Sequence, residues 1–203
     1  MKKDELVDRL HRCYTAVDAA VEGDLSKFPP KIMADEKQFS IYQDFLGGLT
    51  EPQISNLAHT IIHNIANLRD HLRRWAGQNG LDPKEIDRTV ASSAALQVII
   101  DLSNNDKHGY PPRDGGQSKK SPTLVEVKRV LRMSTGPGPG SGIAIVLTLS
   151  GPKQIATGGG FSHVIVTGSV VDGNGAPLGE LYDFGNKALK AWEQQLEAFG
   201  ILT

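Results

Sequence analysis

The pattern of apolar and polar positions predicts helices in the first 112 residues. A first helix is indicated by apolar residues spaced three and four positions apart, namely Leu6, Leu10, Tyr14, Val17 and Val21. Phe28-Pro29-Pro30 breaks it, because proline lacks a backbone donor and restricts the residue before it. A second, shorter helix is expected to carry Phe39, Tyr42, Phe45 and Leu46 and to end at Gly47-Gly48.

Two further helices have clear boundaries in the sequence. Thr50-Glu-Pro-Gln53 is a capping box with proline in the first turn, and an apolar stripe follows it to about Ala76. The next helix begins at Asp82-Pro83, where Glu85 completes a second box. Its body is rich in aliphatic residues from Val90 to Leu102, so we expect it to be largely buried until Gly109 and Pro111-Pro112 end it.

After residue 112 the pattern changes to one typical of strands. Residues 113–122 are polar and contain glycine, which predicts a linker or a long loop. Three strands rich in β-branched residues are expected next, at Leu124–Met133, Ile143–Leu149 and His163–Val171. Asp172-Gly-Asn-Gly175 predicts a tight turn, a short strand around Leu178–Tyr182 returns from it, and a last helix runs from about Asp183 to Phe199.

Together these elements predict an α+β fold. We expect an N-terminal helical bundle over residues 1–112, a linker over 113–122, and a small antiparallel sheet with a C-terminal helix over 123–203. Four strands alone would expose one apolar face, so the last helix or the bundle must cover the sheet.

Composition and charge exclude several classes of protein. The formal net charge of −1 creates no overall field that would recruit nucleic acid or an anionic membrane. A single cysteine, Cys13, excludes an intrachain disulfide framework and a cysteine-rich zinc module, and we expect it to be a small buried apolar residue. No apolar run approaches the ~20 residues of a membrane span, and charges near the N-terminus interrupt any secretory apolar core. We therefore expect a cytoplasmic protein that does not enter membranes.

The polar side of the third predicted helix contains two histidines one turn apart. It is formed by Asn56, His59, His63, Asn67, Asp70 and Arg74. Histidines at this spacing can share a metal ion, but the glutamate of a His-Glu-x-x-His motif is absent, and a third ligand would have to come from Asp70 or another element. We expect this side to face solvent or a partner subunit, with no metal or cofactor; a metal site at His59 and His63 is the alternative.

A narrow polar stripe also follows the fourth predicted helix. It consists of Ser93, Gln97, Asp101, Asn104 and His108, with Lys107 beside it. The negative end of the helix dipole favours a protonated His108, which could hold phosphate, whereas the neutral ring could act as a base near neutral pH. The alternative is a solvent-facing stripe that ends in a C-terminal cap. Because each stripe lies opposite an apolar side, we expect both to face solvent or a partner subunit.

Basic residues are frequent just after this helix. Between residues 113 and 132, two acidic residues accompany six basic ones, namely Arg113, Lys119, Lys120, Lys128, Arg129 and Arg132. With Lys107, they could follow a phosphate backbone, and Arg113, Lys119 and Lys120 are the anion-binding candidates. Tyr110 is the only aromatic residue nearby for base stacking, and a solvated loop and strand edge is the alternative.

The segments Asn67-Leu-Arg-Asp-His-Leu72 and Leu102-Ser-Asn-Asn-Asp-Lys-His108 resemble small helical families related to the HEPN superfamily. The resemblance covers residues 50–112. It implies a helical bundle that is often dimeric and, in active members, metal-independent RNA cleavage by an Arg-x(4–6)-His motif. His108 matches the histidine and Asn104 matches the polar residue that often follows the arginine. Ser103 stands where the motif has arginine, so Lys107 or Arg113 would have to supply the cation.

We expect a non-catalytic interaction protein with a HEPN-like bundle that binds a second copy of itself or a protein partner. The alternative is a divergent HEPN-like, metal-independent ribonuclease in which His108 is the acid or base, Asn104 orients the phosphate, and Lys107 stabilises negative charge. Metal-dependent hydrolysis at His59 and His63 is a third hypothesis.

Overall fold

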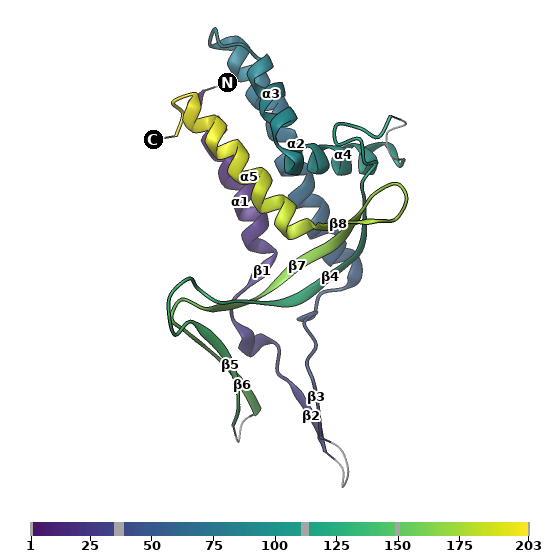
Figure 1. Ribbon diagram of the computed structural model, residues 1–203, viewed down its shortest axis with the longest axis vertical. Helices are drawn as coiled ribbons and strands as arrows, with labels where there is room; N and C mark the ends of the chain where they lie inside the picture. The colour runs from purple at the N-terminus through teal and green to yellow at the C-terminus, as the bar shows by residue number, and fades with distance from the viewer. Residues whose placement is uncertain (1, 35–38, 111–113, 149–150, 203) are drawn as a thin grey trace.

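In the part of the chain that the structure describes, five helices and a small antiparallel sheet form the body, and two β-hairpins project from it (Figure 1). The computed structural model describes residues 2–34, 39–110, 114–148 and 151–202. The helices are α1 (Lys3–Ala19), α2 (Glu51–Gln78), α3 (Lys84–Ser92), α4 (Ala94–His108) and α5 (Leu181–Ala198). The strands are β1 (Val21–Glu22), β2 (Lys31–Ala34), β3 (Phe39–Tyr42), β4 (Thr123–Ser134), β5 (Gly142–Thr148), β6 (Gly151–Thr157), β7 (Phe161–Val171) and β8 (Pro177–Glu180). The α+β class expected from the sequence is confirmed.

The main sheet is built around β7. One edge of β7 pairs antiparallel with β4 from Thr123↔Val171 to Ser134↔Phe161. The other edge pairs with β1 near Ile165 and with β8 near Val170, so two short strands share that edge. A bulge in β4 lies opposite Gly168, where a Cβ atom would stand 2.9 Å from Leu124 Cδ1, so glycine allows the close approach.

The core lies between the helices and the sheet. Val166 and Val170 of β7 pack in one apolar cluster with residues of α1, α2, α4 and α5. Helices α5 and α2 both pack against the sheet, so the last helix and the bundle share the covering role between which the sequence left the choice open. Trp192 of α5 is fully buried and donates from Nε1 to the Ile65 carbonyl oxygen at 3.0 Å. The ends of α1 and α5 lie close together, with Lys3 Nζ 3.0 Å from the Gly200 carbonyl oxygen. Among the described helices, none has the length and hydrophobicity that crossing a membrane requires.

The predicted helix around Phe39–Leu46 is wrong. Phe39–Tyr42 is instead strand β3, which pairs with β2 from Lys31↔Tyr42 to Ala34↔Phe39. The segment is aromatic and β-branched (Phe39-Ser-Ile-Tyr42), a composition that favours strands, and a helix-like spacing of four residues does not outweigh it. Phe45 and Phe28 form an edge-on aromatic pair at the base of this hairpin.

Strand β6 was also absent from the sequence prediction, as were β1 and β2. It pairs with β5 from Gly142↔Thr157 to Thr148↔Gly151 and forms a two-stranded hairpin. Lys153-Gln-Ile-Ala156 is more polar than the neighbouring strands, so its sequence did not indicate a strand. Leu149, the predicted end of the preceding strand, lies outside the described residues. Both this hairpin and β2–β3 point away from the helices (Figure 1).

The fourth predicted helix is two helices that meet at Ser93. Ser93 has an extended backbone (φ −114°, ψ 103°), and its hydroxyl accepts from Leu96 N at 3.3 Å as the N-cap of α4. The chain changes direction there, so α4 runs at an angle to α3, whose buried Ile86 and Val90 pack in the main core (Figure 1). Arg69 of α2 holds α3 through Asp87 at 2.8 Å. This break places the last turn of α4 over the first half of α2.

Asp101 was expected on a stripe facing solvent or a partner subunit, but its side chain is fully buried within the chain. Its carboxylate accepts from Gln117 N at 2.8 Å, from Ser118 N at 2.8 Å and from Ser118 Oγ at 2.7 Å. A Cβ at Gly116, which has φ +72°, would overlap the Asp101 carboxylate. Residues 116–118 are therefore folded tightly onto α4.

We expect Asp101→Asn to lower the free energy of unfolding by about 2–3 kcal/mol, because an amide NH₂ would face backbone donors in a buried site. Urea denaturation monitored by circular dichroism measures the change. The control is Asp70→Asn, on the exposed side of α2, which should change stability by less than about 0.5 kcal/mol. Equal effects of the two substitutions would contradict the structural role of Asp101.

Candidate functional site

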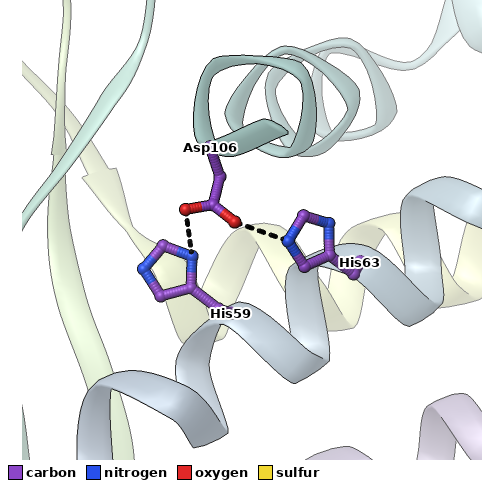
Figure 2. Close-up of side chains that lie close together, drawn as sticks. All are labelled: His59, His63 and Asp106. Atoms are coloured by element: carbon purple, nitrogen blue, oxygen red, sulfur yellow. Dashed lines mark hydrogen bonds and ion pairs between the residues drawn. The ribbon is translucent and has the colours of Figure 1, made fainter. Parts of the chain in front are cut away.

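His59 and His63 of α2 meet Asp106 of α4 (Figure 2). His63 Nε2 lies 2.7 Å from Asp106 Oδ2, and His59 Nδ1 lies 3.2 Å from Asp106 Oδ1. One donor atom from each residue lies within 4.8 Å of the other two. The histidines come together because they are four residues apart on one helix, and the carboxylate arrives because α4 turns at Ser93.

A buried serine orients His63. His63 Nδ1 lies 2.9 Å from Ser103 Oγ, and Ser103 is one turn before Asp106 on α4. The hydroxyl can donate to Nδ1 when Nε2 carries the proton, and it can accept from Nδ1–H when Nε2 binds something else. Ser103 therefore holds the ring in one orientation in either protonation state.

Asp106 is held in its charged form. The hydrogen bond from His63 lowers the pKa of Asp106 below its ordinary value, and the nearby His59 ring adds to this effect. The Asp106 side chain is 41% exposed, whereas those of His59 and His63 are 34% and 27% exposed. The site is thus an ionised carboxylate above two half-buried imidazoles, open to solvent on one side.

The His59 ring has an unsatisfied nitrogen. Nδ1 is shielded from solvent and, although it is at ion-pair distance from Asp106, it has no aligned hydrogen bond with any described residue. Buried Nδ1 atoms of His71 and His163 share this property, but their rings stand apart from the cluster. Across the described ranges, His59, His63 and Asp106 are the one group of three or more His, Cys, Asp or Glu side chains whose donor atoms converge.

Two hollows adjoin the cluster, and His59 and Asp106 line both. A broad hollow of about 740 Å³ continues along α2 and adds Ser55, Asn56, Thr60 and Asn64 to the lining. A smaller one of about 250 Å³ lies between α2, the end of α4 and the start of β4 and is completed by Ile62, Leu102, Asn105, Gly109, Thr123 and Leu124.

The polar stripe of α2 meets the last turn of α4, but through Asp106 and Lys107 rather than through the stripe predicted on that helix. The middle of the α2 stripe lies under the last turn of α4, through the Asp106 contacts and through Lys107 Nζ, which donates to Asn67 Oδ1 at 3.1 Å. Asn56, Asp70 and Arg74 remain exposed. The carboxylate that joins the histidines is Asp106 rather than Asp70.

No hydrogen bond or ion pair joins His108 to Asn104 or Lys107, the other described residues considered for the ribonuclease motif. His108 is exposed at the end of α4, and its ring centre is 6.1 Å from that of Tyr110. Asn104 is half-buried, and Lys107 contacts Asn67. These side chains share the last turns of α4 with Asp106, but neither hollow at the histidine cluster includes them in its lining.

The basic residues after α4 are dispersed. Lys119 pairs with Asp114 at 3.3 Å, Lys120 is exposed, and Arg113 lies outside the described residues. The strand residues also have local partners: Lys128 pairs with Glu126, Arg132 with Asp183, and Arg129 lies over the Phe28 ring and donates to the Leu46 carbonyl oxygen.

Cys13 is buried, as predicted. Burial raises the pKa of the Cys13 thiol to about 12, so the thiol stays protonated at neutral pH and does not compete for metal ions.

Asp106 and Ser103 are the site residues that sequence reasoning missed. Both lie in Leu102-Ser-Asn-Asn-Asp-Lys-His108, three residues apart and therefore on one side of the helix. That spacing was the available signal, but only the direction of α4 shows that this side meets the α2 histidines.

Comparison of the chain with protein-family models, curated protein sequences and solved structures found no match.

Proposed function

We propose that the chain binds a divalent transition metal ion, such as zinc, through His59, His63 and Asp106 and presents it to a small ligand from solvent. The observation that carries this proposal is the convergence of two imidazole nitrogens and an ionised carboxylate from two helices. The sequence argument against a metal site was the missing third ligand, and Asp106 supplies one.

The donor set and its spacing suit such an ion. Two imidazoles with one carboxylate are typical of catalytic zinc sites and of non-haem iron sites. Ligands bonded at about 2.1 Å in a tetrahedron are about 3.4 Å apart, so donors within 4.8 Å need side-chain movements on the order of 1 Å. Three protein ligands leave one position for water or a ligand on the open side. Polarisation of a bound carbonyl or water is the chemistry that this arrangement supports.

Zinc titration of the purified, chelator-treated protein tests the proposal. We expect one zinc ion per chain, with a dissociation constant of about 1 µM or tighter. Magnesium should not bind, because it prefers oxygen ligands to imidazole. No saturable zinc binding by isothermal titration calorimetry at protein concentrations well above that constant would refute the proposal.

Replacing Ser103 with alanine should weaken zinc binding by about 10- to 100-fold, because the hydroxyl that orients His63 is lost. Isothermal titration measures the affinity, and urea denaturation of the metal-free variant measures its stability. We expect metal-free stability to fall by less than about 1.5 kcal/mol, so the affinity loss exceeds what general loosening would produce. The matched control is Ser92→Ala, an exposed serine at the end of α3, which should bind zinc like the parent protein.

The metal-independent ribonuclease and the homo-oligomeric interaction protein stay predictions. If the chain is a metal-independent ribonuclease, it should cleave RNA in the presence of chelator, and His108→Ala should abolish the cleavage. A metal-dependent activity would instead be lost when chelator is added. The second expects a stable oligomer by sedimentation, with or without zinc. A monomer at every concentration would contradict it.

A further inference from the structure

The proposed metal site stands between two hollows that differ in their lining. The broad one presents hydroxyl and amide groups from α2. The small one combines the aliphatic side chains of Ile62, Leu102 and Leu124 with polar groups. Because His59 and Asp106 line both, a ligand bound at the cluster would meet hydroxyl and amide groups on one side and a mixed surface with three aliphatic side chains on the other.

We propose that the site takes a small molecule that binds the metal ion through oxygen and places an uncharged apolar group in the hollow between α2, α4 and β4. This inference rests on the proposed metal site and adds the class of ligand. A cavity of about 150 Å³ lined by aliphatic side chains holds a benzene ring. The hollow of about 250 Å³ therefore has room for a ring or a short aliphatic chain.

The charges around the site disfavour a second negative charge on the ligand. Among the described residues that line the two hollows, none is lysine or arginine. Lys107, next to Asp106 in the sequence, points its ammonium group at Asn67. Asn105, on the wall of the small hollow, donates to the Pro122 carbonyl oxygen at 3.3 Å. A negatively charged group in this hollow would lose part of its hydration and gain no opposite charge from the lining residues.

The walls of the small hollow are fixed by packing. Ile62 and Leu102 belong to the main apolar cluster, and Leu124 packs against it from β4. The shape is therefore present before a ligand arrives, which lowers the cost of ordering on binding. Leu124 is the wall residue that is only half-buried, so it is the one that can be changed with least effect on the core.

Three hydroxamic acids, titrated into the zinc-loaded full-length protein by calorimetry, test the inference. They share one zinc-binding group and differ in the group attached to it: methyl in acetohydroxamic acid, phenyl in benzohydroxamic acid, and a charged ring in 4-carboxybenzohydroxamic acid. We expect the phenyl compound to bind at least about tenfold more tightly than the methyl compound, because it buries apolar surface. The added carboxylate should remove that gain.

Leu124→Ser should reduce the preference for phenyl over methyl by at least about threefold without changing zinc affinity, and Leu124→Met should keep it. If the serine variant does not fold, the three compounds on the parent protein decide alone. Equal affinity for phenyl and methyl, undiminished binding of the carboxylated ring, or equally tight binding of the phenyl compound to metal-free protein would each overturn the inference. Failure to bind zinc would overturn the proposed metal site itself, and it is detected before any hydroxamic acid is added.

Discussion

Trp192→Ala should lower the free energy of unfolding by about 4 kcal/mol. The indole is fully buried where α5 crosses α2 and covers the sheet, so the substitution removes a large apolar contact and leaves a cavity. Folded domains typically have a free energy of unfolding of about 5–15 kcal/mol, so this loss is a large fraction of the total stability. With a urea dependence of about 2 kcal/mol per molar, the midpoint should fall by about 2 M.

Trp192→Phe is the matched control for this experiment. Phenylalanine keeps most of the apolar contact but cannot donate to the Ile65 carbonyl oxygen, so we expect a loss of about 1–2 kcal/mol. The difference between the two variants separates packing from hydrogen bonding. An alanine variant less than about 1 kcal/mol weaker than the parent would mean that α5 does not organise the core.

Helix boundaries with their own local chemistry could be predicted from the sequence. Thr50-Glu-Pro-Gln53 begins α2, and Thr50 N donates to Gln53 Oε1 at 2.8 Å. Asp82 accepts from Lys84 N at 2.9 Å where α3 begins. Asp172-Gly-Asn-Gly175 forms the turn between β7 and β8, where Asp172 Oδ1 accepts from Asn174 N and Ala176 N. In each case the signal and the structure that it specifies lie within a few residues of one another.

Elements that depend on distant pairing were harder to predict. Strands β2 and β3 stabilise each other across a hairpin, and neither has an alternating pattern long enough to outweigh a helical spacing. The same holds for β6, whose polar Lys153-Gln154 pair belongs to an exposed hairpin rather than a half-buried sheet. The short β1 at Val21–Glu22 follows α1 directly and exists only because β7 offers it an edge.

The sequence indicated the histidines of the candidate site but not its carboxylate. The spacing of His59 and His63 indicated a pair of ligands, but it could not indicate which carboxylate would face them. That choice depends on Ser93, whose hydroxyl caps α4 while its extended backbone ends α3. A continuous helix from residue 84 to 108 would carry its last turn in another direction. The break at Ser93 therefore sets the direction of α4, and this direction determines whether Asp106, about four helical turns later, reaches the histidines.

His63→Ala is expected to weaken zinc binding by at least about 100-fold, because one of three protein ligands is lost and Asp106 loses its shortest contact in the cluster. Zinc at about 100 times its dissociation constant should stabilise the parent protein by about 2.7 kcal/mol, and this gain should vanish in the variant. Thermal unfolding with and without zinc gives the stabilisation, and calorimetry gives the affinity.

His108→Ala is the matched control, because His108 is also on a helix near the cluster but is exposed and contacts Tyr110 instead. It should bind zinc with the affinity of the parent protein. The same pair of variants separates the metal site from the ribonuclease prediction, since RNA cleavage by the HEPN-like motif would be lost in His108→Ala and kept in His63→Ala. Zinc binding that survives His63→Ala and disappears in His108→Ala would place the ion at the end of α4 and remove the basis for the site between the helices.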